Sequence, residues 1–365
     1  MIIDLLQQII DYSKLANQIS CMSVDRYTYD NLYIYSLDIY KKHGFNQKNI
    51  EQKKFSQLRI LNCPNNSCVY SVNHLADTLE ELYCNGKINN HELDQGGISQ
   101  LTRLRVLDCT DNFKINSVNH LKNTLIELYC GGDCFIDQNG IADLGYLEIL
   151  DCSNNWNIKN VCHLGKTLKK LVCRHGGIDQ EGILNLNNLT SLDCSYNAKI
   201  CDVNHLSKTL EKLCCSCGKD PISGIDQKGI SGLKNLRVLE CIWNDYIYDV
   251  SHMAESLKEL YCAESGINQN GISKLKVLEI LYCIDCENIT SVCHLADSLL
   301  ELNCSGCYSG ITDKGIVGLK KINKLICNGN NYIHDIDHLS ESLKELHYDE
   351  KQFNTPFAKS VLCKQ

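Results

Sequence analysis

One short phrase, Leu-x-x-Leu-x-Cys, constrains the fold of this chain more than any other feature. The first set of copies, the last of them looser, ends at Cys63, Cys109, Cys152, Cys194, Cys241, Cys283 and Cys327. The second set, in which a tyrosine takes the last cysteine position, ends at Cys84, Cys130, Cys173, Cys215, Cys262, Cys304 and Tyr348. The step from the first to the second type is always 21 residues, whereas the return step varies from 21 to 26. Fourteen phrases in this register predict a solenoid of about 14 coils.

A coil of this length cannot bury its apolar side alone, so it must stack on its neighbours. The two leucines and the cysteine are expected to point into the core, and the residues between them onto a concave sheet. Three residues after the first-type cysteine the chain carries Asn66, Asn112, Asn155, Asn197, Asn244, Cys286 and Asn330. This spacing resembles the leucine-rich-repeat consensus over residues 55–350. The fold expected is therefore α/β, a curved leucine-rich-repeat solenoid with a parallel concave sheet and short helices or turns on the convex side.

Two further patterns mark the convex side. A histidine follows each first-type cysteine by 11 residues, in the phrase Ile-x-x-Val-x-His-Leu, and is expected to bond a neighbouring turn. The second-type coils carry Ile-Asp-Gln-x-Gly-Ile, which predicts short capped helices. The expected capping residues are Asp137, Asp179, Asp226, Asn268 and Thr312.

The segment before the repeats has a different pattern. Residues 1–50 are expected to form a helical N-terminal cap, residues 51–350 the solenoid and residues 351–365 a C-terminal tail. The order of elements in DLLQQIIDYSKLANQISCMSVDRYTYDNLYIYSL resembles a degenerate F-box, without its initial Leu-Pro. With the repeats, the chain resembles the F-box/leucine-rich-repeat proteins of giant DNA viruses of the mimivirus type. That resemblance implies docking of Leu5, Leu6 and Ile9 on a cullin-ligase adaptor.

Composition restricts the partners and the compartment. The net charge of −8 and the pI near 5.8 argue against nucleic acid, and no apolar run is long enough to span a membrane. The N-terminus lacks the basic start and the cleavage site of a signal peptide. Most of the 24 cysteines fall in one buried position, so they are expected to be reduced. An intracellular, reducing location follows, namely the host cytoplasm if the protein is viral.

One metal-like pattern competes with this interpretation. Cys283, Cys286, Cys304 and Cys307 have the spacing of a structural zinc site, but they also fit the repeat positions, and the sequence leaves their zinc binding open. The histidines recur only in every second coil, about 10 Å apart, which is too far for shared coordination. No nucleophile–base set, phosphate loop or paired carboxylates emerge. We therefore expect no catalysis, no cofactor and no metal.

The exposed positions of the predicted strands are the candidate binding site. They form an acidic strip with aromatic residues, which is typical of a surface that binds a basic or mixed-charge protein partner. The alternative is that the acidic residues only keep a long sheet soluble. The candidate residues are Tyr83, Asp108, Glu127, Tyr129, Asp151, Asp193, Tyr196, Glu240, Trp243, Glu259, Tyr261 and Tyr282.

The expected function is protein–protein interaction. The first hypothesis is an F-box-like substrate receptor that brings a target to a cullin-type ubiquitin ligase through its repeats. The alternative is a plain leucine-rich-repeat scaffold or inhibitor whose N-terminus only caps the solenoid. A zinc-supported structural protein is a third possibility.

Overall fold

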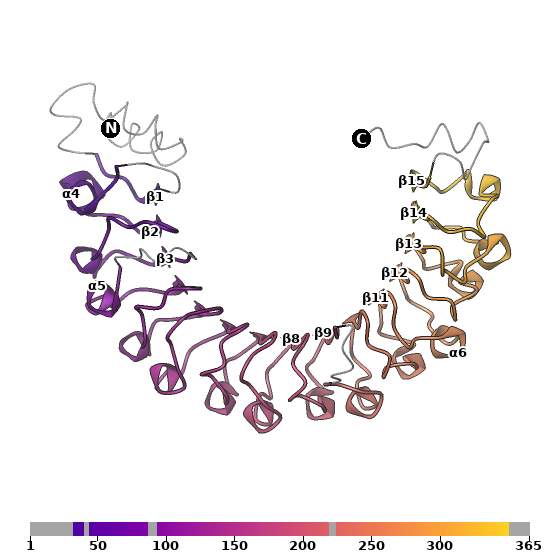
Figure 1. The fold of residues 1–365 in the computed structure, drawn as a ribbon, viewed down its shortest axis with the longest axis horizontal. Coiled ribbons are helices and arrows are strands. Elements are labelled where there is room, and N and C mark those ends of the chain that lie inside the picture. The colour runs from indigo at the N-terminus through magenta and orange to yellow at the C-terminus, as the bar shows by residue number, and fades with distance from the viewer. Residues whose placement is uncertain (1–31, 40–43, 87–92, 219–223, 350–365) are drawn as a thin grey trace. The chain divides into compact units, whose positions relative to one another are not determined.

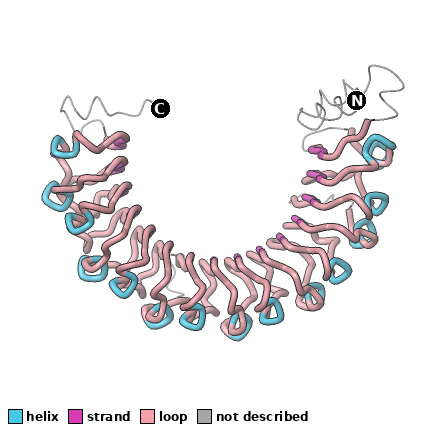
Figure 2. The backbone as a smooth tube through the Cα atoms, turned by 180° about the vertical axis from the view of Figure 1, so that it is seen from behind, coloured by secondary structure: helices cyan, strands magenta, loops and turns pink. Residues whose placement is uncertain are grey.

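A computed structural model describes residues 32–39, 44–86, 93–218 and 224–349. The chain divides into two compact units, Met1–Leu186 (unit 1) and Asn187–Gln365 (unit 2). Within each unit, parallel strands pair in chain order; they line one side of the unit, and the short helices line the opposite side (Figures 1 and 2). The predicted docking positions Leu5, Leu6 and Ile9 and the predicted C-terminal tail lie outside the described residues.

The strands of unit 1 follow the predicted phrases closely, and each pairs with the next in register. They are β1 (Ser36–Asp38), β2 (Ile60–Asn62), β3 (Glu81–Tyr83), β4 (Val106–Asp108), β5 (Glu127–Tyr129), β6 (Ile149–Asp151) and β7 (Lys170–Val172). The short helices are α4 (Gln47–Ile50), η1 (Lys53–Phe55), η2 (Asn73–Leu75), α5 (Gln95–Ile98), η3 (Asn119–Leu121), η4 (Asn139–Ile141), η5 (Cys162–Leu164) and η6 (Glu181–Ile183).

Unit 2 repeats the same arrangement. Its strands are β8 (Ser191–Asp193), β9 (Lys212–Cys214), β10 (Val238–Glu240), β11 (Glu259–Tyr261), β12 (Ile280–Tyr282), β13 (Glu301–Asn303), β14 (Lys324–Ile326) and β15 (Glu345–His347). Its short helices are η7 (Asn204–Leu206), η8 (Lys228–Ile230), η9 (Ser251–Met253), α6 (Gln269–Ile272), η10 (Cys293–Leu295), η11 (Asp313–Ile316) and η12 (Asp337–Leu339).

The core is built as the phrase predicts. In the coils of β2 to β14 the central leucine of the strand and the cysteine after it are buried, as Leu107 and Cys109 illustrate, both with 0% exposure. We call the row of cysteines that follow the strands the cysteine ladder. Burial raises the pKa of many of these thiols, that of Cys63 to about 12, which keeps them protonated near neutral pH. The thiols therefore act as small apolar side chains in the core.

The buried asparagines hold consecutive coils together. Asn155 Nδ2 donates to the backbone oxygens of Cys130 (3.0 Å) and Ile136 (2.9 Å) in the preceding coil, and its Oδ1 accepts from Asn157 N at 2.9 Å. Asn244 makes the same set of bonds. Cys286 takes this position in its own coil and donates from Sγ to the backbone oxygen of Cys262 at 3.0 Å. This position therefore bonds each of these coils to the one before it.

Three residues of the phrase Ile-Asp-Gln-x-Gly-Ile have separate roles: the aspartate caps the short helix, the glutamine bonds to the next coil, and the glycine allows close packing on the preceding coil. Asp137 Oδ1 accepts from Gly140 N at 2.8 Å, which confirms the predicted cap. Gln138 reaches the next coil, where its Nε2 donates to Asn160 O at 2.7 Å. Gly140 approaches the preceding coil so closely that a Cβ would lie 2.3 Å from Asn116 O. Thr312 is the exception among the predicted caps, because its side chain makes no capping bond.

The first coil begins earlier than the sequence analysis predicted. Strand β1 pairs with β2, so fifteen strands are described instead of fourteen phrases, and residues counted with the N-terminal helical segment belong to the repeat. Ile34, Leu37 and Ile39 are buried and match the phrase with isoleucine in the cysteine position. A search anchored on cysteine passes over this copy. The predicted helices and the Leu5, Leu6 and Ile9 docking positions in residues 1–31 lie outside the described residues.

Candidate functional site

The strand face of unit 1, defined as the solvent-facing side of β1 to β7, brings several predicted residues together. The first and third residues of each strand lie on this side, while the central leucine is buried. In-register pairing aligns Tyr83 with Asp108, Asp108 with Tyr129, and Tyr129 with Asp151. Parallel strands lie about 4.8 Å apart. Tyrosine and aspartate therefore alternate in one continuous row across β3 to β6.

The tyrosines in this row are held by glutamates on their own strands. Tyr83 OH donates to Glu81 Oε2 and Tyr129 OH donates to Glu127 Oε2, each at 2.9 Å. Residues two apart in a strand share a face, so the motif Glu-Leu-Tyr places both groups within reach. Burial and then the bond to the neighbouring glutamate raise the pKa of Tyr83 and of Tyr129 to about 12. Both hydroxyls stay protonated at neutral pH, and both rings are fixed before any partner arrives.

The aspartates in the row have a structural role that the sequence analysis did not anticipate. Asp108 Oδ1 accepts from Thr110 N at 3.0 Å, and Asp151 Oδ1 accepts from Ser153 N at 3.0 Å. Each bond turns the chain immediately after its strand, as aspartate commonly does. The turn needs an acceptor oxygen at this position but not a negative charge. Asparagine would meet the same need.

Negative charge accumulates on this face. Strands β1 to β6 carry Asp38, Glu81, Asp108, Glu127 and Asp151, and their sequences contain no lysine or arginine. Burial raises the pKa of Asp108, and the nearby Asp151 and Asp111 carboxylates raise it further. A cation that approached this face would reduce the repulsion among the carboxylates.

A hollow lies at one end of the same face. Its volume is about 670 Å³. The residues around it are mostly polar or acidic, and Asp38 was not among the predicted site residues because the coil of β1 was missed. The lining is Ser36, Leu37, Asp38, Ile60, Asn62, Pro64, Asn65, Glu81, Tyr83, Asn85 and Asp108.

The corresponding face of unit 2 is different at β8 to β10. The predicted binding residue Asp193 is only 7% exposed, and its neighbour Cys214 only 3%, so the expectation that Asp193 is an open contact residue is wrong. Asp193 Oδ1 instead accepts from Ser195 N at 3.2 Å. Glu240 accepts from Cys214 Sγ at 3.5 Å and from Ser216 Oγ at 3.4 Å. The acids here take part in a local polar cluster.

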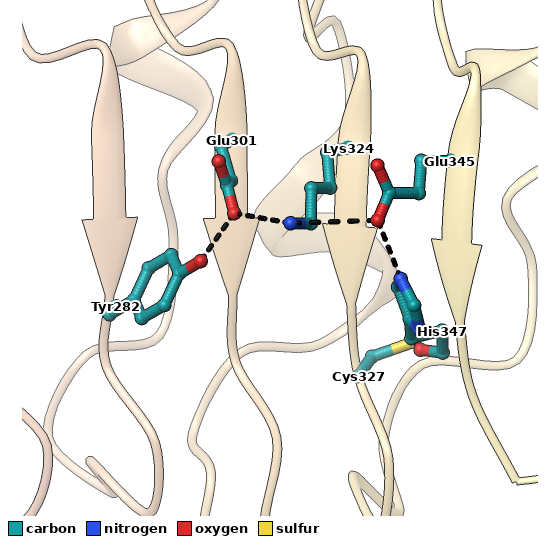
Figure 3. A network of polar contacts seen from close by, with 6 residues as sticks. All are labelled: Tyr282, Glu301, Lys324, Cys327, Glu345 and His347. Carbon is teal, nitrogen blue, oxygen red and sulfur yellow. Dashed lines mark hydrogen bonds and ion pairs between the residues drawn. The ribbon is translucent and has the colours of Figure 1, made fainter. Parts of the chain in front are cut away.

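Farther along unit 2, the strand face neutralises its own charges (Figure 3). Glu301 accepts from Tyr282 OH and lies 3.1 Å from Lys324 Nζ, which is 3.5 Å from Glu345 Oε1. Glu345 Oε1 also lies 2.7 Å from His347 Nε2. The contacts with His347 and then Lys324 lower the pKa of Glu345, and Glu301 raises the pKa of Lys324. The predicted contact residue Tyr282 belongs to this network.

The other predicted aromatic residues of unit 2 lie either on a strand or in the turn just after one. Tyr261 donates to Glu259 at 3.0 Å, and its ring meets that of Tyr282 edge to face at 5.1 Å. Tyr196 and Trp243 follow the strands and adopt a left-handed backbone, each with φ of 59°. Trp243 Nε1 donates to Glu264 Oε1 at 2.9 Å. Large side chains are rare in this conformation, which other coils fill mainly with glycine, asparagine or aspartate.

The structure also exposes aromatic residues that the sequence analysis did not single out. Phe135 and Trp156 are 59% and 58% exposed, in the turns that follow β5 and β6. The ring of Phe135 meets that of Phe113 at 6.2 Å. The signal in the sequence was their position four or five residues after the strand cysteine. The Leu-x-x-Leu-x-Cys phrase ends before that position, so a search for strands does not include it.

The cysteines and histidines that suggested metal have structural partners. All 22 cysteines in the described ranges are free thiols. Cys283, Cys286 and Cys304 are buried whereas Cys307 is exposed, and no metal-binding group of three His, Cys, Asp or Glu side chains occurs among the described residues. Nε2 of His120 lies 3.1 Å from Ile98 O in the preceding coil, and most of the other register histidines repeat this contact. The predicted histidine bond to a neighbouring turn is confirmed.

Comparisons with known proteins identify the fold. No protein-family model and no curated protein matches the sequence. The functional domain of InlJ from Listeria monocytogenes, which includes a cysteine ladder, matches with a TM-score of 0.57 at 20% identity, over 87% of this chain and 69% of that one. An internalin (inlF) from the same organism matches at 0.53 and 17%, over 89% and 94%. Rad7, from the complex of Rad7 and Elc1 in yeast, matches at 0.50 and 14%, over 100% and 91%.

The chain thus has a leucine-rich-repeat solenoid fold, as the sequence predicted. In the part of the chain that is described, no helix has the length and apolar character needed to cross a membrane.

Proposed function

We propose that this chain is a non-catalytic interaction protein that holds a basic segment of a protein partner on the strand face of unit 1. The observation that carries the proposal is the alternating row of Tyr83, Asp108, Tyr129 and Asp151. Aromatic anchors surrounded by groups of one charge are typical of protein-binding surfaces. A lysine or arginine of the partner would pair with a carboxylate and pack against the neighbouring ring.

The fixed geometry of this row favours binding. The hydrogen bonds that the tyrosine hydroxyls donate to Glu81 and Glu127 hold the rings, so the partner does not have to order them, and less conformational entropy is lost on association. Burial raises the pKa of Asp108, and the nearby Asp151 and Asp111 carboxylates add to that rise, so these like charges oppose one another in the free protein. A basic partner removes that repulsion. In unit 2, by contrast, Lys324 already neutralises Glu301 and Glu345, so this end offers less to a cation.

The finer form of the proposal is an F-box-like substrate receptor of a cullin-type ubiquitin ligase. Its support is the F-box-like order of elements before the repeats, with Leu5, Leu6 and Ile9 on one predicted helix face. The structural neighbour Rad7 forms a complex with Elc1. We therefore propose to test whether this chain also assembles with a second protein, the ligase adaptor. The alternative is a scaffold or inhibitor that uses the same strand face but recruits no ligase.

We further propose that the protein works in a reducing compartment, as the host cytoplasm would be for a viral protein. The support is the cysteine ladder, whose thiols in the described ranges are all free.

Charge-neutral variants test the strand face directly. Asp108→Asn with Asp151→Asn removes two charges but keeps the oxygen that each turn requires. Each lost contact to a cation is worth about 0.5–1 kcal/mol, so binding of a labelled Lys-Gly repeat peptide should weaken roughly five- to thirtyfold. Fluorescence anisotropy at low salt gives the Kd.

A matched control makes that experiment specific. Asp77→Asn with Asp143→Asn removes the same charge from exposed positions beside η2 and η4, on the turn side. This control should bind the peptide like the natural protein, and a Glu-Gly repeat peptide should not bind at all. Equal weakening in both double variants, or equal binding of both peptides, would overturn the proposal.

A pull-down separates the ligase receptor from the scaffold. The purified full chain mixed with the cullin-ligase adaptor should form a complex that is lost when Leu5, Leu6 and Ile9 are changed to glutamate. If the natural chain does not bind the adaptor at micromolar concentration, the receptor form is rejected and the scaffold form remains. The peptide experiment is unaffected by that result, so the two parts fail separately.

A further inference from the structure

Two buried cysteines outside the cysteine ladder each contact a ladder cysteine of the preceding coil. Cys134, in the turn after β5, places its Sγ 3.8 Å from Sγ of Cys109, and the two residues are 2% and 0% exposed. Cys286 contacts Cys262, but its Sγ also donates to Cys262 O in the role of the buried asparagine. The contact between Cys109 and Cys134 has no such repeat function. No other second-type coil has a cysteine four residues after its ladder position.

The geometry sets this pair apart from neighbours within the ladder. Ladder cysteines follow parallel strands in register, so adjacent side chains point the same way at about the strand spacing of 4.8 Å. That orientation suits a disulfide poorly, because the bond needs the two Cβ–S vectors to turn toward each other. Cys134 comes from a turn instead of a strand. Its sulfur already touches that of Cys109.

We propose that Cys109 and Cys134 form an oxidation-sensitive dithiol, which closes to a disulfide between adjacent coils when the protein meets a small-molecule disulfide such as oxidised glutathione. In the first step the Cys134 thiolate attacks one sulfur of the oxidant, and the S–S bond breaks to release one glutathione thiolate. In the second step the Cys109 thiolate attacks the Cys134 sulfur and releases the other. Two protein thiols are oxidised, one glutathione disulfide is reduced to two thiols, and the two protons pass to the released thiolates.

The surroundings of the two sulfurs assign their roles. The hydrogen bond with Cys109 lowers the pKa of Cys134, and a backbone bond from Ile136 lowers it further. Burial raises the pKa of other ladder thiols, such as Cys84 and Cys152. The thiolate is the reactive form, so Cys134 is the attacking sulfur. Because Cys134 is only 2% exposed, the first step needs a local opening of the turn that carries it.

Peptide mapping tests this inference on the full natural chain. The reduced protein is incubated with oxidised glutathione, the remaining thiols are alkylated in denaturant, and the digest is analysed by mass spectrometry. We expect a peptide pair joined through Cys109 and Cys134, lighter by two hydrogen masses than the reduced pair. It should form before any cross-link between ladder neighbours such as Cys109 and Cys130.

Two variants serve as controls. Cys134→Ser should abolish the cross-link, whereas Cys68→Ser, at an exposed cysteine, should leave it unchanged. The natural chain alone decides the question if Cys134→Ser fails to fold. Absence of the Cys109–Cys134 cross-link in protein that keeps its circular dichroism spectrum, or a lasting glutathione adduct on Cys134 with Cys109 still free, would overturn the proposal.

Discussion

Gly182 is a position where a single added methyl group should disturb the stacking of adjacent coils. A Cβ there would lie 2.3 Å from Lys159 O, 3.1 Å from Asn160 Cα and 3.2 Å from Ile178 Cγ2. The glycine cannot move away, because Gly182 N donates to Asp179 Oδ1 at 3.0 Å and Gly182 O accepts from Val161 N at 3.0 Å. The obstacle is backbone of the preceding coil, which has no rotamer to change.

The expected magnitude follows from two opposing effects. Overpacking against a rigid neighbour costs about 1–3 kcal/mol. Replacing glycine by alanine in a helical turn returns about 0.5–1 kcal/mol. Gly182→Ala should therefore lower the free energy of unfolding by about 1–2 kcal/mol and reduce the urea midpoint measured by circular dichroism. The motif glycine Gly140 faces the same contact and should behave alike.

Gly145 provides the matched control for this substitution. It lies in unit 1, its φ is not in the left-handed region, and a Cβ there meets nothing within 4 Å. Gly145→Ala should leave the urea midpoint unchanged or raise it slightly. If Gly182→Ala proves as stable as Gly145→Ala, the close approach of adjacent coils is not what requires glycine in this motif.

Three further predictions concern groups that the repeat buries or aligns. Asn155→Ala should lower the free energy of unfolding, measured by urea denaturation, by about 2–4 kcal/mol, because it removes the hydrogen-bond donor to the buried oxygens of Cys130 and Ile136. A decrease below about 0.5 kcal/mol would contradict these hydrogen bonds. Burial lowers the pKa of His74, His120, His163 and His294 below 6.5, so the unfolded chain takes up protons first. The stability that these histidines contribute above pH 6.5 should be lost as the pH falls below it, and a urea midpoint that rises on acidification would oppose this. Ultraviolet titration should show Tyr129 ionising near pH 12, a transition that Tyr129→Phe removes; ionisation near pH 10 would contradict the burial of the ring and its hydrogen bond to Glu127, which together raise this pKa.

The repeat itself was predictable because its signal is periodic. A leucine or cysteine at a fixed step reports a buried position, so the strands, the buried asparagines and the histidine bonds follow from spacing alone. Copies that keep the shape but change the chemistry are harder to find. Ile39 fills the cysteine position of the first coil, and the segment was therefore assigned to an N-terminal helix.

The candidate site was predictable only in part. Alternation along a strand places Tyr129 and Asp151 on one face, and the structure brings them together. The alternating pattern does not tell which acidic side chains remain exposed to a partner. Asp193 lies in the same position as Asp151 but is buried, and Glu301 is neutralised by Lys324 from the next strand. Those differences depend on neighbouring coils, which a pattern within one coil cannot contain.

Photo-cross-linking from Tyr129 tests the central claim most directly. A photoreactive phenylalanine analogue at Tyr129 keeps an aromatic ring in the row, and the same analogue at Tyr146, which is 60% exposed on the turn side, is the control. On irradiation with the Lys-Gly repeat peptide, the chain substituted at position 129 should be cross-linked and the chain substituted at position 146 should not. Cross-linking from position 146 alone would place the binding surface on the other side of the coil and contradict the proposed role of the strand face.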